Sequence, residues 1–254
     1  MLISHVLRRR FDMKKTAAGI LVLLLLLFCN FAYSEIDSNY SMEQMCIEIN
    51  GHELSFWLYT PSDIGSNTAL IVYLHGGTSR GDDLSLLVAH EGLPQYLLDG
   101  KLSPSALIAM PQAPENVRSW EEMDEDILGL ISFLTDHYPI DSAKISLTGH
   151  SMGGIGTWLI GYEHQDIFFR IAPLSGAISR KVQSHLRSFM LPVWSFVGTD
   201  ESDQNAYNSN TSAFPEFEQY NTNTRLTIME GFKHREVVKA YLLYDIIGWL
   251  ISAD

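Results

Sequence analysis

One stretch of the chain constrains the fold more than any other: KISLTGHSMGGIGTWLIGYE, residues 144–163. Its first half predicts a buried strand, and a glycine-rich turn follows. Beyond the turn, apolar residues recur at helical spacing at Ile155, Trp158, Leu159 and Tyr162, which predicts a helix. A buried strand that turns directly into a helix is typical of a parallel sheet covered by helices.

The rest of the chain repeats this alternation of short apolar runs and longer stretches with helical spacing. The predicted strands are residues 46–49, 54–60, 69–75, 106–111, 144–149, 170–176, 192–198 and 225–230. Asn50-Gly51 joins the first two, and this dipeptide favours a two-residue turn between antiparallel strands. The later runs are almost continuously apolar, as expected of strands that are covered on both faces. The sequence therefore predicts an α/β fold of three layers, with a mostly parallel sheet preceded by a hairpin.

Two of the predicted helices are well marked. Residues 120–138 place Met123, Ile127, Leu130, Ile131 and Leu134 on one face, while acidic residues crowd the N-terminal end. Because the helix dipole favours acids there, we interpret them as a solvated helix start and not as catalytic carboxylates. Residues 236–252 predict a closing amphipathic helix whose tyrosines and tryptophan pack in the core.

The N-terminus has a different character. From Met13 the chain has two lysines, an apolar run to Phe28 and small residues before Glu35, which is typical of a secretory signal peptide. We therefore expect residues 1–34 to be a signal peptide, with Met13 as a candidate true start, and residues 35–254 to be one domain. An uncleaved signal anchor is the alternative. Cleavage would give an exported protein, periplasmic or secreted, with no stable membrane association.

The net charge limits which partners the protein can bind, and the number of cysteines limits which disulfides it can form. Residues 35–254 hold 12 Lys and Arg against 29 Asp and Glu, so their net charge is -17. So acidic a surface argues against nucleic acid as a partner. Removal of the signal would leave Cys46 as the single cysteine, which excludes an intramolecular disulfide. We expect it to be a buried strand residue.

The turn after residue 148 carries the first candidate for chemistry. GHSMG places Ser151 between Gly149 and Gly153, the pattern of a nucleophile elbow on which a serine sits in a strained turn at the edge of the sheet. A Cβ at either flanking glycine would clash in so tight a turn, and Gly154 lets the helix lie close to the sheet. Ser151 is therefore the predicted nucleophile.

A second glycine pair lies upstream, where the strand at 69–75 ends in His75-Gly76-Gly77. Such a loop can turn backbone amides toward the serine, so we predict the amides of Gly77 and Met152 as oxyanion-hole donors. His75, at the root of the loop, is expected to have a structural role. His150 is expected to point away from the serine.

The remaining members of a triad must come later in the chain, since the order on this framework is Ser, acid, His. His234 follows the last strand and is the predicted base. After the strand at 192–198 the chain offers three carboxylates: Asp200 is preferred because it is nearest the strand end, Asp203 comes next, and Glu201 is third. The other histidines have no metal-ligand spacing, so we predict no metal.

These motifs resemble those of the α/β-hydrolase superfamily. The order of YLHGGT, GHSMGGIGTW, APLSG, PVWSFVGT and GFKHR over residues 45–252 is similar to secreted esterases near the polyhydroxybutyrate depolymerases, feruloyl esterases and prolyl-oligopeptidase-like hydrolases. The resemblance implies hydrolysis of a carboxylic ester through an acyl-enzyme, without a cofactor. In the family an Asp usually stands three residues after Gly198, where this chain has Glu201. No long insertion precedes residue 192, so we expect no large lid and a small, soluble ester. Trp120 could line the cleft or pack in the core.

Two other functions fit parts of this pattern. A serine peptidase would use the same triad, although peptidases of this fold usually carry an additional domain. A secreted binding module with a decayed triad would retain the fold and lose the chemistry.

Overall fold

The computed structural model describes residues 39–201 and 204–252. The predicted signal peptide, residues 1–34, and Asp203 lie outside the described residues. The chain divides into two units, Met1–Phe31 and Ala32–Asp254, and everything described here belongs to the second. None of the helices in the described residues is long and apolar enough to cross a membrane.

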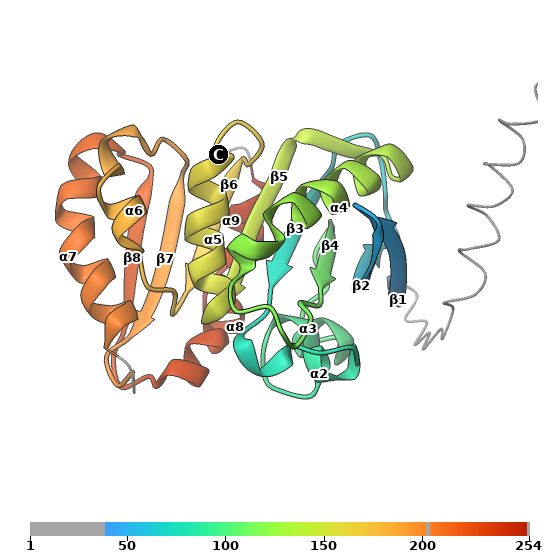
Figure 1. The fold of residues 1–254 in the computed structure, drawn as a ribbon, viewed down its shortest axis with the longest axis horizontal. Coiled ribbons are helices and arrows are strands. Elements are labelled where there is room, and N and C mark those ends of the chain that lie inside the picture. The colour runs from blue at the N-terminus through green and yellow to red at the C-terminus, as the bar shows by residue number, and fades with distance from the viewer. Residues whose placement is uncertain (1–38, 202–203, 253–254) are drawn as a thin grey trace, which may run out of the picture. The chain divides into compact units, whose positions relative to one another are not determined.

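An eight-stranded sheet forms the middle layer of this unit, in the order β1-β2-β4-β3-β5-β6-β7-β8 (Figure 1). The strands are β1 (Tyr40–Ile49), β2 (His52–Pro61), β3 (Thr68–Leu74), β4 (Ala106–Pro111), β5 (Ile140–His150), β6 (Arg170–Leu174), β7 (Val193–Gly198) and β8 (Thr224–Met229). Every neighbouring pair from β4 to β8 is parallel, while β2 is antiparallel to both β1 and β4. The predicted mostly parallel sheet with an N-terminal hairpin is confirmed.

The hairpin turn has the predicted chemistry. Asn50 and Gly51 have φ values of 53° and 86°, which is the left-handed conformation that a two-residue turn of this type demands at both positions. Strand β1 begins at Tyr40, six residues before the apolar pattern starts, because its polar residues alternate with buried ones along an edge strand. Cys46 on β1 is half-buried and not buried as expected.

Helices cover both faces of the sheet. They are α2 (Ser85–Val88), α3 (Leu93–Leu98), α4 (Asp124–His137), α5 (Met152–Glu163), α6 (Arg180–Gln183), α7 (Asn205–Tyr220), α8 (Ala240–Leu243) and α9 (Ile246–Ile251), with 3-10 turns η1 (Gly77–Ser79), η2 (Trp120–Met123), η3 (Leu186–Ser188) and η4 (His234–Lys239). Helices α4, α5 and α7 share one buried cluster with the sheet, and α2, α3, α8 and α9 share the other. Figure 1 shows α4 and α5 on the opposite side of the sheet from α9.

The predicted helix at 120–138 is a 3-10 turn, η2, followed by α4. Ser119 and Glu122 form a capping box at its start, which satisfies backbone N–H groups that would otherwise lack partners. The predicted apolar face is buried. One acid departs from the expectation of a solvated start: Asp126 is buried and accepts a hydrogen bond from Asn50 at 3.0 Å, which ties the helix to the hairpin turn.

The predicted closing helix at 236–252 is wrong as a single element. The chain forms η4 and α8, then breaks at Tyr244, which is extended, and resumes as α9. Asp245 causes the restart, because its carboxylate accepts a hydrogen bond from the Gly248 amide at 3.0 Å and so caps α9. Tyr241 is buried, while Tyr244 and Trp249 are only partly buried.

Candidate active site

Ser151 is the single residue between the end of β5 and the start of α5. Its φ of 60° and ψ of -116° lie outside the regions that a residue with a side chain ordinarily adopts. Hydrogen bonds hold this conformation from both sides: the Ser151 amide donates to the Leu174 carbonyl at 3.0 Å, and the Ile155 amide donates to the Ser151 carbonyl at 2.9 Å. The strained turn that the sequence predicted is present at this residue.

Close backbone approach explains the glycines around Ser151. A Cβ on Gly153 would come within 1.8 Å of the Leu74 carbonyl oxygen, and one on Gly149 within 2.5 Å of the same atom. A Cβ on Gly154 would meet the Leu174 carbonyl oxygen at 2.4 Å. The helix can therefore start directly at the sheet edge only because these positions lack side chains.

The upstream glycine loop lies against this turn. A Cβ built on Gly76 would be 3.5 Å from the Cβ of Ser151, and one on Gly77 would be 4.0 Å from the Met152 sulfur. Gly77 begins η1 and Met152 begins α5. The two residues predicted as oxyanion-hole donors thus lie side by side next to the serine.

His75 is an internal hydrogen-bonding residue. Its Nδ1 donates to the Gly76 carbonyl at 2.7 Å, and its Nε2 accepts from the Ala113 amide at 2.9 Å. The Trp120 indole donates to the His75 carbonyl at 3.0 Å and is itself fully buried, so this tryptophan belongs to the core. Burial lowers the pKa of His75 to about 4, so the ring is neutral at pH 7 and supports the glycine loop.

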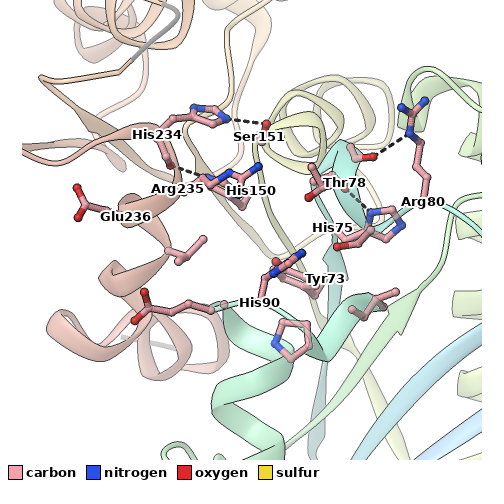
Figure 2. Close-up of a pocket in the computed structure, with 18 of the residues that line it drawn as sticks. Tyr73, His75, Thr78, Arg80, His90, His150, Ser151, His234, Arg235 and Glu236 are labelled. Atoms are coloured by element: carbon pink, nitrogen blue, oxygen red, sulfur yellow. Dashed lines mark hydrogen bonds between the residues drawn. The ribbon is translucent and has the colours of Figure 1, made fainter. Parts of the chain in front are cut away.

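His234 connects the serine to a carboxylate. Its Nε2 lies 2.7 Å from Ser151 Oγ, and its Nδ1 lies 2.6 Å from Glu201 Oε2 (Figure 2 shows the Ser151 bond). An ionised carboxylate only accepts hydrogen bonds, so Nδ1 carries the proton and Nε2 is left to accept from the serine hydroxyl. His150 instead bonds the His234 carbonyl at 2.8 Å, which agrees with its expected orientation away from Ser151 Oγ.

This geometry corrects the prediction that Asp200 is the acid paired with His234. After β7 ends at Gly198, the Asp200 amide donates to the Phe232 carbonyl at 3.1 Å, and the Asp200 side chain is exposed. The next residue therefore turns inward, and Glu201, ranked third from the sequence, is the carboxylate that contacts His234.

Glu201 is buried, with 4% of its surface exposed, and both of its carboxylate oxygens have partners. Oε1 accepts from the Ser175 hydroxyl at 2.5 Å and from the Gly198 amide at 3.3 Å, while Oε2 faces His234. Burial raises the pKa of Glu201, but the hydrogen bonds from His234 and Ser175 outweigh burial and hold the pKa below its ordinary value. The acid is therefore ionised at neutral pH.

Ser151 and His234 open onto a pocket of about 620 Å³. The Gly76-Gly77 loop, the Tyr73 ring and the segment from His90 to Gly92 line its other sides. Figure 2 shows Arg80 on the loop side and Arg235 beside His150. Lys239, which also lines the pocket, is paired with Glu91 at 3.9 Å and Glu236 at 3.7 Å. Residues 39–201 and 204–252 contain no group of three or more His, Cys, Asp or Glu side chains that could hold a metal ion.

A scan against protein families finds a match over residues 48–236 to the model of the Esterase family, described as "Putative esterase". The chain belongs to the Esterase family. A search of curated proteins finds no match. Among solved structures, a thermostable esterase is similar at 23% identity and a TM-score of 0.66; the alignment covers 84% of this chain and 62% of that one.

For two further solved structures, the alignment with this chain covers nearly the whole length of the other protein. The S-formylglutathione hydrolase of Staphylococcus aureus is similar at 13% identity and a TM-score of 0.67, over 87% of this chain and 100% of that chain. A ferulic acid esterase is similar at 13% identity and a TM-score of 0.63, over 84% and 98%. These likenesses establish the α/β-hydrolase fold that the motifs indicated.

Sequence reasoning missed one residue of this candidate site. Ser175 lies directly after β6 in the run RIAPLSG. The sequence predicts a strand there and includes APLSG among the family motifs, but it assigns Ser175 no role in the site. Its backbone is left-handed, with a φ of 46°, and its hydroxyl contacts Glu201. The single signal in the sequence is a polar residue followed by Gly176 at the end of an apolar run, and that signal also fits an ordinary loop.

Proposed function

We propose that the protein is a serine hydrolase that cleaves carboxylic esters of small, soluble substrates through an acyl-enzyme intermediate. The observation that carries this proposal is the continuous hydrogen-bond chain from Ser151 Oγ through His234 to Glu201 at the wall of a pocket. Membership of the Esterase family supports the class of bond. A pocket of about 620 Å³ is of the size that small-molecule sites have.

The reaction uses the three side chains in turn. Ser151 Oγ attacks the ester carbonyl carbon while His234 Nε2 takes the hydroxyl proton, and Glu201 stabilises the imidazolium. The amides of Gly77 and Met152 donate to the oxyanion. When the tetrahedral intermediate collapses, the C–O bond breaks and His234 protonates the leaving alcohol. A water then attacks the acyl carbon of the acyl-enzyme and gives a proton to His234. The bond between the acyl carbon and Ser151 Oγ breaks, His234 returns the proton to Ser151 Oγ, and the carboxylic acid is released.

Labelling with a fluorophosphonate tests this proposal. We expect one equivalent to react with the wild-type protein at Ser151 and none with Ser151→Ala, as measured by mass spectrometry of the intact protein. A matched control is Ser195→Ala, which removes a buried hydroxyl on β7 that has no contact with His234 and should leave labelling unchanged. Folded wild-type protein that stays unlabelled would overturn the serine mechanism and favour a binding module.

A second measurement separates an esterase from a peptidase. Hydrolysis of p-nitrophenyl acetate and p-nitrophenyl butyrate is expected, with no turnover of an aminoacyl anilide. The absence of amide cleavage is expected because an amine is a poorer leaving group than a phenol or alcohol, so its departure requires more precise protonation. Faster cleavage of the anilide would replace the esterase proposal with the peptidase alternative.

We further propose that the enzyme acts after export, on the basis of the signal-like sequence before Glu35 and the net charge of -17 that remains beyond it. Mass spectrometry of the protein recovered from outside the cytoplasm would give the N-terminus. A protein that keeps residues 13–34 would contradict cleavage.

A further inference from the structure

Resting on the proposed function, we propose that Ser175 is a positioning residue, which fixes the Glu201 carboxylate against His234 and lowers the proton affinity of the Glu201–His234 pair. Ser175 lies at the end of β6, and 2% of its surface is exposed. It does not line the pocket, so it acts through Glu201 and not on the substrate.

The backbone of Ser175 indicates that the position requires its side chain. With a φ of 46°, the residue adopts a left-handed conformation that glycine takes freely and that other residues take at a cost. The Ser175 amide is held by the Phe196 carbonyl at 2.8 Å, so the conformation is fixed by the sheet. Glycine at this position would relieve the strain, yet the chain has a serine there. We therefore infer that the Ser175 hydroxyl has a role in the site.

That hydroxyl contacts the acid directly. Ser175 Oγ donates to Glu201 Oε1 at 2.5 Å, and the Gly198 amide reaches the same oxygen at 3.3 Å. Oε2 is thereby left facing His234 at 2.6 Å. A glutamate has one more rotatable bond than an aspartate, so its carboxylate needs more restraint to hold one orientation, and these two donors provide it.

The chain segment that carries Ser175 also holds the turn at Ser151. Leu174, the residue before Ser175, accepts the hydrogen bond from the Ser151 amide at 3.0 Å. Two consecutive residues of one chain segment therefore hold the nucleophile turn and the acid. The spacing between Ser151 and Glu201, which His234 must bridge, is set partly by this segment.

Within the part of the chain that the structure describes, few other charged groups face the Glu201–His234 pair. The His150 ring from β5 lies 5.0 Å from the His234 ring between centroids, and burial lowers the pKa of His150 to about 4, which keeps it neutral. Arg235 on η4 is exposed, and so is Asp200 on the loop after β7. The Ser175 hydroxyl is therefore a main local donor that stabilises the carboxylate, and its loss should let the Glu201–His234 pair bind its proton more tightly.

The variant Ser175→Gly tests this inference, because it removes the hydroxyl and also relieves the left-handed strain, so the fold should be retained. We expect kcat/KM for p-nitrophenyl acetate to fall by about tenfold or more, the size of one hydrogen bond to a charged group. The acid limb of the kcat/KM profile should move to higher pH. Ser195→Ala, which removes another buried hydroxyl, is the matched control and should leave the limb in place.

A double-mutant cycle decides whether Ser175 acts through Glu201. In a Glu201→Ala background, Ser175→Gly should cause no further loss of activity. A loss that persists there, or a loss in Ser175→Gly with an unmoved acid limb, would overturn the inference and assign Ser175 a purely structural role.

A readout without turnover separates this inference from the proposed function. The pKa of the His234 imidazole, measured by NMR in a Ser151→Ala background, should rise on adding Ser175→Gly. An unlabelled, inactive wild-type protein would refute the hydrolase proposal, whereas an unchanged His234 pKa in this experiment would refute the role of Ser175 alone.

Discussion

At the scale of single residues, the identity of the proposed triad acid depends on which side chain turns inward after β7. Glu201 bonds His234, while the neighbouring Asp200 is exposed. We expect Glu201→Gln to lower kcat by about 10² to 10⁴-fold, because an amide cannot stabilise the imidazolium or fix the tautomer of His234. Asp200→Asn should change kcat less than about threefold. Steady-state kinetics on p-nitrophenyl butyrate gives both values.

Thermal unfolding of the two variants provides the control for folding. Both should unfold cooperatively, so that the loss in Glu201→Gln reflects chemistry. An Asp200→Asn variant that loses as much activity as Glu201→Gln would contradict the observed arrangement and restore the acid that the sequence favoured.

The three residues of the proposed triad differ in how far the sequence could identify them. Ser151 was predictable because glycines flank it and a strand and helix enclose it, so the local pattern alone defines a strained turn. His234 was predictable from chain order. The acid was not predictable, since three carboxylates stand within four residues of the sequence. Which of Asp200 and Glu201 turns inward depends on contacts to the loop after β8, such as the hydrogen bond from the Asp200 amide to the Phe232 carbonyl.

At the scale of elements, the join between β5 and α5 tolerates no side chain on Gly153. A Cβ there would lie 1.8 Å from the Leu74 carbonyl oxygen, so strand β3 or the helix would have to move. We expect Gly153→Ala to lower the free energy of unfolding by about 3 kcal/mol or more, as measured by urea denaturation.

Gly65→Ala is the matched control for Gly153→Ala, because no atom lies within 4 Å of its added Cβ. This change should leave stability unaltered or raise it by up to about 1 kcal/mol. Equal stabilities for the two variants would show that α5 can shift away from β3, against the close contact described here.

Helices and strands were predictable from the sequence where buried residues recur with a simple period. They were less predictable where a capping residue decides where a helix begins or ends. Each strand from β2 to β8 overlaps a predicted strand, but β8 lies at the edge of the sheet and only its last residue, Met229, is buried, so the expected cover on both faces is wrong for this strand. The closing segment, in contrast, keeps helical spacing from 236 to 252 yet breaks at Tyr244, because Asp245 caps a new helix. Periodicity reports which face is buried, and it does not report a change of direction between two helices that bury the same face.

At the scale of the whole molecule, two buried histidines make the fold sensitive to acid. Burial lowers the pKa of both His75 and His150 to about 4, whereas an unfolded chain protonates histidine near pH 6.5. Between these values the unfolded state binds protons that the folded state excludes. The free energy of unfolding should therefore fall as the pH drops from about 6.5 to about 4, by up to about 3 kcal/mol for each histidine.

Urea denaturation at a series of pH values measures this slope. Replacing His75 by Gln removes one titrating group, so the dependence on pH between about 6.5 and 4 should become shallower even if the variant is less stable throughout. The exposed His185, changed to Gln, is the matched control and should leave the slope unchanged. A His75→Gln variant with the wild-type slope would contradict this prediction, because it would mean that His75 takes up its proton in the folded state. Protonated Nε2 could then no longer accept the hydrogen bond from the Ala113 amide below neutral pH.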